Sequence, residues 1–510
     1  MTPCDPPVDP YANDKNDKAT PGAFRTGALP WRLLAQGHAL ARRQLLAAAD
    51  SSWVPAARRA QARVAAQLLS DASAPANFPL TNSEALLRAR DSRGASAVRG
   101  ARNFLDDVCR RNGRPAKMRP GLFHLGVTLA ATPGKVVHRN TYVELLQYAP
   151  QTPTVRTVPV FLIPAWVNKY YIYDLAPDRS LVEFLVRGGH TVFCLSLRDP
   201  GNGGVLPDLD AYLTQLLLPA LEVVQELTAS PRVHLTGVCA GGLLALSLAA
   251  RLKGSGQPRA ASLSLLNSPL AAPGPGDAGP LSGSASPVEI AVLSRLLSRN
   301  RHLISGRRLG LLFDLLRGDA TVWGPLADGW LYGERAPGFD LLAWSEDTID
   351  MPRAVFEQTL RMTVEDRLAR NELTLAGTPV RPSAVPAADT FVVAAERDHL
   401  VSWDTVYRSA RLFGDGCAFR LVPSGHMGAI VNPPRPGARH LAREGPLPPD
   451  SSDWLRTAVP RDESWWEGWG RWLADRSGPS VPARLPGSLR HPPLDSAPGR
   501  YATRHRPTRH

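Results

Sequence analysis

Short apolar runs alternate with amphipathic segments from about residue 121 onward. Three amphipathic segments have helical spacing: residues 180–189, residues 209–230, which contain Pro219, and residues 241–254. Four intervening runs are apolar almost throughout, as buried strands are: VPVFLIPAW (158–166), HTVFCLSL (190–197), RVHLTGV (232–238) and AASLSLLNSPL (260–270). Strands that are buried on both faces and alternate with helices predict a parallel sheet covered by helices on both sides.

The alternation stops at residue 271 and returns at residue 389. A stretch rich in Gly, Pro and Ser opens a mainly helical region that runs to about residue 375. The strand pattern then resumes in DTFVVAAERDH (389–399) and CAFRLVP (417–423). An insertion between two parts of a sheet predicts a cap over an active site, here residues 271–375 of a catalytic domain that spans 121–476.

The two ends of the chain have different patterns. Residues 31–120 are rich in Ala, Leu and Arg with helical spacing, and predict a helical N-terminal domain. Residues 1–30 are polar and Pro-rich, and residues 477–510 combine Pro, Arg and His with few apolar residues. Both ends are therefore predicted to be disordered.

Charge does not favour nucleic-acid binding, although the 510-residue chain has a formal net charge of +13. From Arg476 to His510 there are seven Arg and one acidic residue, Asp495, so this basic tail carries about half of the excess. Basic patches interleaved with aromatic residues are missing. A solvated terminus is the simpler interpretation of the tail, and contact with an anionic surface is the alternative.

Other global features point to a cytoplasmic protein without a metal. No apolar run reaches the roughly 20 residues that span a bilayer, and the first residues lack the apolar core of a signal peptide. Five cysteines without paired spacing suggest neither a disulfide framework nor a zinc cluster. We expect no transmembrane segment, no metal and no cofactor.

The segment GVCAGG places Cys239 between the predicted strand 232–238 and the predicted helix 241–254. It fits the nucleophile-elbow pattern G-x-S-x-G with cysteine in place of serine. Glycines suit the strained turn, the helix N-terminus favours a thiolate, and the backbone N–H of Ala240 is placed to hold an oxyanion. A buried structural cysteine in a glycine turn is the alternative interpretation.

A cysteine nucleophile on this scaffold needs an acid and a histidine later in the chain. Asp398 follows the strand TFVVAA directly, and His426 follows the next strand between two glycines. Both lie at strand ends, where active-site loops gather. His399 can line the same site, or it can be an ordinary loop residue. This order of residues predicts an α/β-hydrolase fold with a Cys239, Asp398 and His426 triad.

The thiol also indicates the class of substrate. A thiolate exchanges readily with a thioester, because the attacking and leaving groups are of nearly equal strength. Cysteine on this fold therefore favours acyl transfer from thioesters over ester hydrolysis.

These segments resemble the polyhydroxyalkanoate synthase family over about residues 78–478. The resemblance is carried by FHLGVTLAATPGKVVHRNTYVELLQYAP (123–150), by 160–200 with its AWVNKYYIYDL motif, by GVCAGG, by 395–434 with Asp398 and His426, and by DESWWEGWGRWLADRSG (462–478). The Ala-Gly-Gly form of the cysteine box is closest to synthases of medium-chain-length (class II) type.

The resemblance implies a function and partners. Cys239 would take the acyl group of an (R)-3-hydroxyacyl-CoA, His426 would act as general base, and Asp398 would orient His426 or help to activate the 3-hydroxyl. Repetition would elongate a polyester and release CoA. Trp166 and His399 would line the substrate site. The family further implies a homodimer at the surface of cytoplasmic polyester granules, with the CoA thioester as substrate rather than cofactor.

The chain also departs from the family pattern. Leu197 and Asp199 stand where the family has Trp and Asn, no Asp follows the strand at 260–270, and the cap segment RGDATVWGPLADGWLYG (317–333) differs. Two alternatives remain open: a related enzyme that hydrolyses thioesters or transfers a single acyl group with the same triad, and a catalytically silent granule-binding protein. Release of CoA without polymer would favour the first alternative.

Overall fold

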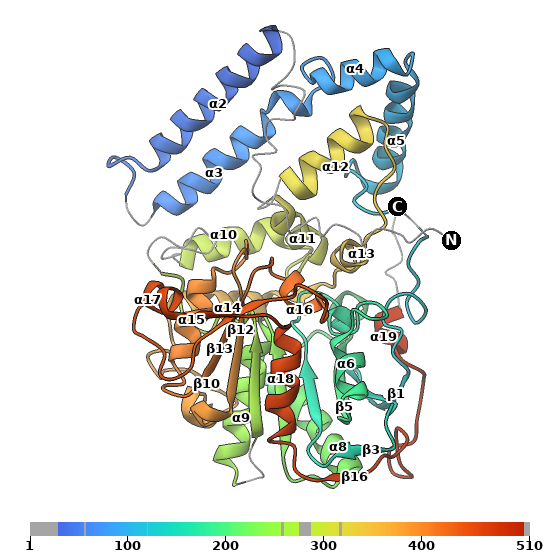
Figure 1. The fold of residues 1–510 in the computed structure, drawn as a ribbon, viewed down its shortest axis with the longest axis vertical. Helices are drawn as coiled ribbons and strands as arrows, with labels where there is room; N and C mark the ends of the chain where they lie inside the picture. The colour runs from blue at the N-terminus through green and yellow to red at the C-terminus, as the bar shows by residue number, and fades with distance from the viewer. Residues whose placement is uncertain are drawn as a thin grey trace. The chain divides into compact units, whose positions relative to one another are not determined.

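The computed structural model describes residues 29–55, 58–119, 121–256, 260–274, 287–315 and 319–503. The described chain divides into two compact units (Figure 1). The sheet unit contains the described residues of 123–274, 285–309 and 344–503. The helical unit contains those of 29–122 and 310–343.

Within the described residues, the sheet unit is built on a ten-stranded sheet with the order β1-β2-β5-β4-β6-β7-β12-β13-β14-β15. The six central strands, β5 to β13 in that order, pair in parallel, and the flanking pairs are antiparallel. The central strands are Val192–Leu197 (β5), Val160–Ile163 (β4), Val233–Val238 (β6), Ala260–Leu266 (β7), Thr390–Ala395 (β12) and Ala418–Val422 (β13). All six coincide with predicted strands, and this sheet confirms the predicted fold class.

Two antiparallel pairs extend the sheet at its edges. The edge strands are Gly134–Arg139 (β1), Val143–Tyr148 (β2), His440–Ala442 (β14) and Val459–Arg461 (β15). Short two-stranded pairs also join Thr154–Arg156 (β3) to Ser480–Pro482 (β16), Leu303–Ile304 (β8) to Met351–Pro352 (β9), and Thr374–Leu375 (β10) to Thr378–Pro379 (β11).

Helices cover both faces of the central strands. The helices that lie wholly within the sheet unit include Leu181–Arg187 (α6), Leu209–Ala211 (α7), Leu218–Thr228 (α8), Gly241–Gly254 (α9), Pro287–Leu297 (α10), Arg353–Val364 (α14), Trp403–Arg411 (α15), Gly428–Val431 (α16), Ser451–Thr457 (α17), Trp465–Ala474 (α18) and Gly499–Thr503 (α19). None of the helices in the described residues is both long enough and apolar enough to cross a bilayer.

The alternation of side chains along β7 shows how two of these helices are placed. Ser264 faces α18, because its hydroxyl accepts a hydrogen bond of 2.8 Å from the indole N–H of Trp469. The neighbouring Leu265 faces α9, where it lies against Gly242. Successive residues of a strand point to opposite faces, so α9 and α18 cover opposite faces of the sheet.

The predicted helix at 209–230 is present as a helical run over 209–228, with a π-helical segment at Tyr212–Leu217 between α7 and α8. Pro219 is the second residue of α8, directly after this segment. A proline cannot donate the regular i to i−4 hydrogen bond, and a wider turn just before it accommodates that loss without ending the helix.

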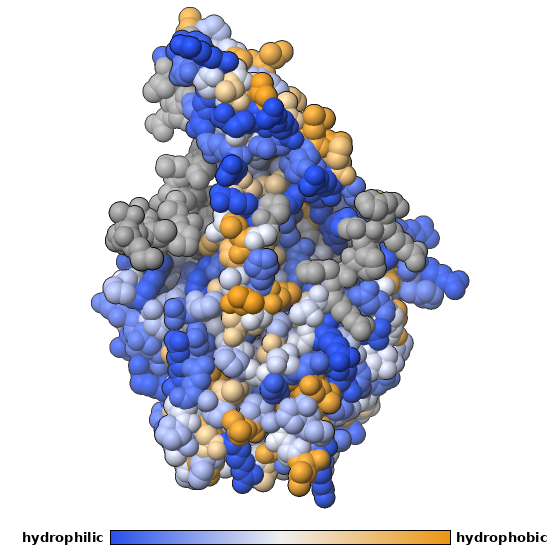
Figure 2. All heavy atoms as spheres, turned by 90° about the vertical axis from the view of Figure 1, so that its right-hand side faces the viewer, coloured by the Kyte–Doolittle hydropathy of each residue, from blue (hydrophilic) through white to orange (hydrophobic). Residues whose placement is uncertain are grey.

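The helical unit contains helices in the region where helical spacing predicts them. They are Leu29–Ala49 (α2), Arg59–Ala72 (α3), Ser83–Asp91 (α4) and Ala95–Arg111 (α5). They pack with a later part of the chain that includes Asp319–Trp323 (η6), Gly324–Leu326 (α12) and Ala327–Leu331 (η7). Apolar side chains, orange in Figure 2, reach the surface among the polar ones of this unit.

The predicted cap does not form one insertion of the sheet unit. Within 271–375, residues 310–343 belong with the N-terminal helices, whereas α10 and α14 belong to the sheet unit. The chain changes unit inside Gly306–Leu315 (α11) and again inside Asp340–Glu346 (α13). The physical reason is local packing: Gly100 of α5 comes so close to the carbonyl of Trp330 that an added Cβ would lie 2.0 Å from it.

The prediction of a disordered tail over 477–510 is wrong for residues 477–503. This carboxy-terminal strap, residues 480–503, contains β16 and α19 and follows the edge strand β1. Val136 of β1 accepts a hydrogen bond from Leu494 and donates one to Asp495, each 2.8 Å long. The buried carboxylate of Glu144 accepts the backbone N–H groups of Arg500 and Tyr501 at 3.2 and 3.0 Å. The strap is thus ordered by pairing with the edge of β1, by the buried Glu144 side chain and by the buried Tyr501 and Ala502 of α19.

The remaining predictions of terminal disorder cover residues that the structure leaves out. Residues 1–28 and 504–510 lie outside the described chain. Of the predicted disordered segment 1–30, only residues 29 and 30 are described, and they are the first residues of α2.

Candidate active site

Cys239 stands at the sharp turn between β6 and α9. Its backbone φ is +51°, a left-handed conformation that is rare outside glycine. The neighbouring glycines are required by close backbone approach: a Cβ on Gly237 would lie 2.5 Å from the carbonyl oxygen of Gly241, and one on Gly241 would lie 2.4 Å from that of Ile163. The sequence GVCAGG therefore folds as the predicted strained elbow.

The turn is held in place from a neighbouring strand and leads into a helix N-terminus. The N–H of Cys239 donates a 2.8 Å hydrogen bond to the carbonyl of Leu266, at the end of β7. Ala240 is the N-cap residue of α9. The first N–H groups of a helix have no partner within the helix and carry its positive dipole end. The Ala240 amide is therefore in a suitable position to bind a developing oxyanion.

Cys239 differs from the other described cysteines in its exposure. It is partly exposed, whereas Cys194 and Cys417 are buried and Cys109 is exposed on α5. Burial raises the pKa of Cys417 to about 12 and raises that of Cys194 well above its usual range. Both buried thiols therefore stay protonated, which leaves Cys239 as the accessible thiol of the sheet unit among the described residues.

Asp398 lies in the turn after β12 and His426 in the turn after β13, as predicted. The Nδ1 atom of His426 forms a hydrogen bond with Oδ2 of Asp398. The other oxygen, Oδ1, accepts the backbone N–H groups of Leu400 and Val401 at 2.9 and 3.1 Å. The carboxylate is thus fixed by its own turn and orients the imidazole.

His426 also contacts Cys239, so the structure brings the three predicted residues together. Burial by itself would lower the pKa of His426, but the Asp398 carboxylate and hydrogen bonds to Asp398 and Cys239 outweigh it and raise the pKa to about 10. The imidazole is almost fully buried, with 2% of its side chain exposed. This arrangement places a strongly basic imidazole in contact with the sulfur of Cys239, as a cysteine nucleophile requires.

Two further residues were predicted to line the site, and they follow the strands β12 and β4. His399 is partly buried in the turn that carries Asp398. Trp166 follows β4, is buried, and packs edge-to-face on Tyr212 at a centroid distance of 5.8 Å. Trp166 is thus a core residue at the carboxyl end of β4.

Asn267 is a site residue that sequence analysis missed. It follows β7, is fully buried, and has a φ of +49°. Its N–H donates to the carbonyl of Val393 at 2.8 Å, and its side-chain Nδ2 donates to the carbonyl oxygen of His426. Asn267 therefore links the loop of His426 to the ends of β7 and β12. The sequence feature that could have indicated Asn267 is an asparagine directly after a predicted strand, because asparagine tolerates a left-handed backbone conformation.

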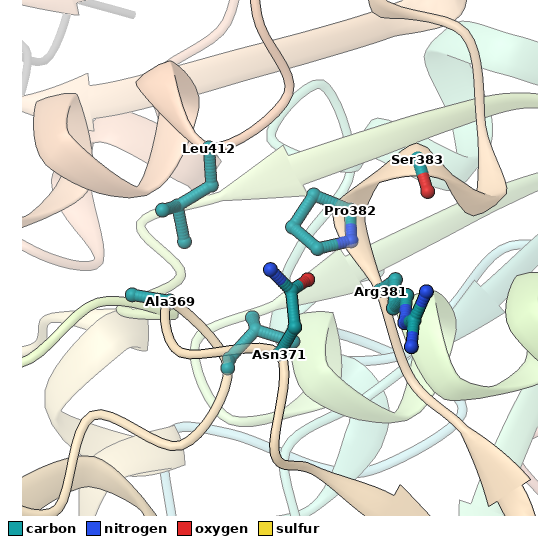
Figure 3. Close-up of a pocket in the computed structure, with 7 residues that line it drawn as sticks. Ala369, Asn371, Arg381, Pro382, Ser383 and Leu412 are labelled. Atoms are coloured by element: carbon teal, nitrogen blue, oxygen red, sulfur yellow. The ribbon is translucent and has the colours of Figure 1, made fainter.

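A separate hollow lies elsewhere on the sheet unit (Figure 3). Its volume is about 510 Å³, and its lining residues are Leu368, Ala369, Asn371, Arg381, Pro382, Ser383 and Leu412. None of the triad residues lines it. Arg381, the one charged lining residue, is exposed. This hollow therefore lacks the cysteine and histidine that meet at the end of the central strands.

Comparison with protein families matches two parts of the chain. Residues 27–185 match the family described as poly-beta-hydroxybutyrate polymerase (PhaC) N-terminus. Residues 158–433 match the family described as alpha/beta hydrolase fold. The second match contains β4, Cys239, Asp398 and His426, and agrees with the observed sheet.

Curated proteins similar to this chain share one description. The poly(3-hydroxyalkanoate) polymerase subunit PhaC of Cupriavidus necator is 33% identical over 94% of this chain and 81% of its own length. Poly(3-hydroxyalkanoate) polymerase 2 of Ectopseudomonas oleovorans is 34% identical over 87% of this chain and 78% of its own length. The poly(3-hydroxyalkanoate) polymerase of Methylorubrum extorquens is 32% identical over 85% and 72%, respectively.

Proposed function

This chain belongs to the poly(3-hydroxyalkanoate) polymerase family, and from that premise we propose that it polymerises (R)-3-hydroxyacyl-CoA through a covalent thioester on Cys239, releasing CoA. The observation that supports the proposal most directly is the contact of His426 with both Asp398 and the partly exposed Cys239. Family membership agrees with the predicted resemblance. The medium-chain-length preference stays a prediction.

The proposed first step loads the enzyme. The sulfur of Cys239 attacks the thioester carbonyl, and its proton resides on His426. The carbonyl oxygen becomes an oxyanion that the Ala240 N–H stabilises. Collapse of this intermediate breaks the bond to the CoA sulfur, which leaves with the proton held by His426. The attacking and leaving groups are both thiolates, so this exchange is close to balanced in free energy.

The proposed second step extends the chain. The 3-hydroxyl of the next (R)-3-hydroxyacyl-CoA gives its proton to His426 and attacks the acyl group on Cys239. An ester bond forms and Cys239 leaves as a thiolate. The elongated chain is then a CoA thioester, and it returns to Cys239 by the first step with release of CoA. Each cycle therefore adds one unit and liberates one CoA.

The test follows CoA release and polymer mass separately with 3-hydroxybutyryl-CoA and 3-hydroxyoctanoyl-CoA. We expect both products from the unchanged protein, an acyl adduct on Cys239 by mass spectrometry, and neither product from Cys239→Ala. Cys109→Ser, which alters an exposed cysteine of the helical unit, is the matched control and should keep full activity. Equal CoA release by Cys239→Ala and the unchanged protein would overturn the covalent mechanism.

The same experiment separates polymerisation from its alternative. Release of CoA with free 3-hydroxy acid and no polymer would assign the triad to a thioesterase or a single acyl transfer. The ratio of rates with the two substrates measures the predicted preference for medium-chain units.

We also propose that the protein acts as a homodimer on the surface of cytoplasmic polyester granules, as its family resemblance implies. Sedimentation velocity with and without substrate tests the dimer. Fractionation of cells that accumulate polyester tests the granule association, which predicts recovery of the protein with the polymer fraction.

A further inference from the structure

Residues 347–352, here the rim segment, lie across the loops that follow β4 and β5. Asp347 pairs with Nζ of Lys169 at 2.9 Å, and Thr348 forms an isolated antiparallel bridge with Asn168. Both partners lie in the loop after β4, the strand next to β6 and its nucleophile elbow. The rim segment therefore borders the edge of the sheet that carries Cys239.

Two buried carboxyl groups fasten the rim segment to the end of β5. Asp199 accepts the N–H groups of Gly201 and Asp350 at 2.7 and 3.2 Å through the same oxygen. Asp350 accepts the N–H of Gly306 at 3.1 Å and pairs with Arg299 at 2.8 Å. Asp199 is 8% exposed and Asp350 is 1% exposed. Both carboxyls thus hold backbone groups of separate segments, and they lie close to each other in a dry environment.

We propose that Asp199 and Asp350 are positioning residues that form a proton-sensitive fastening, which holds the rim segment against the active-site edge when the pair carries a proton and loosens when both groups are ionised. The link to catalysis rests on the proposed function. The fastening itself rests on the contacts alone.

Burial favours the protonated form of this pair. Burial raises the pKa of Asp350 to about 6, and the negative charge of Asp199 also raises it. The hydrogen bond from Gly306 and the positive charges of Arg299 and Arg307 lower the pKa, but their effect is smaller. Burial also raises the pKa of Asp199. Its two backbone hydrogen bonds and the positive charges of Arg299 and Lys169 lower that pKa, but they do not cancel the effect of burial.

The sign of the pH effect follows from these directions. A carboxyl whose pKa is higher in the folded state than its unfolded value of 3.8 contributes stability below that value. This contribution is lost as the pH rises through the folded value of about 6. The rim segment is therefore fastened more firmly at pH 5 than at pH 7.5.

Asp350→Asn is the sharpest variant, because its amide oxygen can still accept the Gly306 N–H and the group no longer ionises. Asp199→Asn keeps an oxygen that accepts the two N–H groups and removes the like charge next to Asp350. Asp347→Asn is the matched control, because it weakens the rim segment through Lys169 and leaves the carboxyl pair intact.

Hydrogen–deuterium exchange of the peptide over 344–352, corrected for intrinsic rates, tests the fastening without any assay of activity. In the unchanged protein we expect protection to fall at least tenfold between pH 5 and pH 7.5. Asp350→Asn should show less than a threefold change. Asp199→Asn should keep part of the difference, because burial is the main cause of the raised pKa of Asp350. Asp347→Asn should be less protected at both pH values and keep the tenfold difference.

Two results would overturn the fastening: exchange in the unchanged protein that is independent of pH, or a tenfold pH dependence that Asp350→Asn retains. The link to catalysis is tested by the ratio of polymerisation rates of Asp350→Asn and the unchanged protein, which should change at least threefold over the same pH range. A constant ratio would overturn that link alone. Absence of polymerase activity in both proteins would contradict the proposed function and leave the exchange result standing.

Discussion

The sheet unit and the helical unit bury their apolar residues in different ways. The strands β4, β6 and β12 are buried at every position, with branched and aromatic side chains between two layers of helices. Across the described residues of 29–122, the buried apolar residues are small: Ala49, Val54, Ala66, Ala74 and Ala85. Large side chains of the same helices are exposed, such as Leu69 at 65% and Leu105 at 58%.

The interior of each unit is therefore stabilised by a different kind of interaction. Burial of a large apolar side chain contributes about 1.5–3 kcal/mol to the free energy of unfolding, and the sheet unit buries many such side chains. The helical unit has a small apolar cluster of Ala85, Ala327, Leu331 and Tyr332. It depends further on close backbone approach at Gly100 and on polar contacts, such as the hydrogen bond of 3.2 Å from Asn82 to the Tyr332 hydroxyl. A small number of specific contacts fix residues 327–334 against α4 and α5. Single substitutions are therefore expected to separate residues 327–334 from these two helices.

The largest expected effect concerns chemistry that lies entirely in the sheet unit. Asp398→Asn should lower the polymerisation rate by about 10³–10⁴-fold, because the imidazole of His426 loses the anion that orients it and stabilises its charge. The turn keeps its acceptor for Leu400 and Val401, so the melting temperature should change little. Rates and thermal melts on the same samples provide the measurement. A rate within tenfold of the unchanged protein would remove Asp398 from the triad.

Packing at the elbow is expected to show the largest stability effect. In Gly241→Ala the added Cβ would lie 2.4 Å from the Ile163 carbonyl, and overpacking of this kind costs about 1–3 kcal/mol. Gly254→Ala lies in the same helix, where the nearest atom is 4.0 Å away, and should be neutral or slightly stabilising. Urea unfolding followed by fluorescence measures both. Equal midpoints for the two variants would contradict the close packing of β4 and α9.

The corresponding test in the helical unit uses Gly100→Ala. Its Cβ would lie 2.0 Å from the carbonyl of Trp330, so α5 and residues 327–331 must move apart at a cost of about 1–3 kcal/mol. Gly37→Ala on α2 has open space around it and is the matched control. Limited proteolysis should cut Gly100→Ala within 319–334 faster than the control, while the melt of the sheet unit stays the same. Loss of the sheet-unit transition as well would show that the two units unfold together.

A smaller effect is expected from the pH response of the sheet unit. His234 is buried between the hydroxyls of Ser262 and Ser477, and burial lowers its pKa from 6.5 to about 3. The free energy of unfolding falls when the pH drops below the histidine pKa of the unfolded chain, because only the unfolded chain then takes up the proton. Between pH 7.5 and pH 5 this amounts to about 2 kcal/mol.

The variant His234→Gln keeps polar atoms at this position and removes the titration. Its unfolding free energy should therefore fall by about 2 kcal/mol less than that of the unchanged protein over the same pH range. Guanidinium unfolding at the two pH values measures the difference. Parallel pH profiles for both proteins would show that the acid response of the sheet unit arises elsewhere.

Sequence analysis predicted the parts of the fold whose pattern of apolar and polar residues lies within one short segment of the chain. Central parallel strands are buried on both faces, so they appear as continuous apolar runs, and all six were identified. The edge strand β15 is exposed along its length and has no such pattern. The strap was missed for a related reason: its order depends on Glu144 and on the free edge of β1, which lie some 350 residues earlier in the chain.

The same distinction applies to the site. Cys239, Asp398 and His426 each follow a strand directly, and a parallel sheet gathers the carboxyl ends of its strands at one edge. Their sequence context was therefore enough to predict that they meet. Asn267 acts through a backbone carbonyl in another loop, a contact that depends on the register of β7 beside β12 and leaves no motif.

The strap has a consequence for the order in which the protein is made. Tyr501 contacts Glu144 of β2 across 357 positions of sequence. At typical translation rates of 5–20 residues per second, roughly 20 to 70 s separate the synthesis of these two residues. During that interval β1 has an exposed edge, and exposed strand edges are sites where nascent chains pair with one another. A ribosome-bound chain therefore passes through a period in which a chaperone that shields strand edges would be of most use to it.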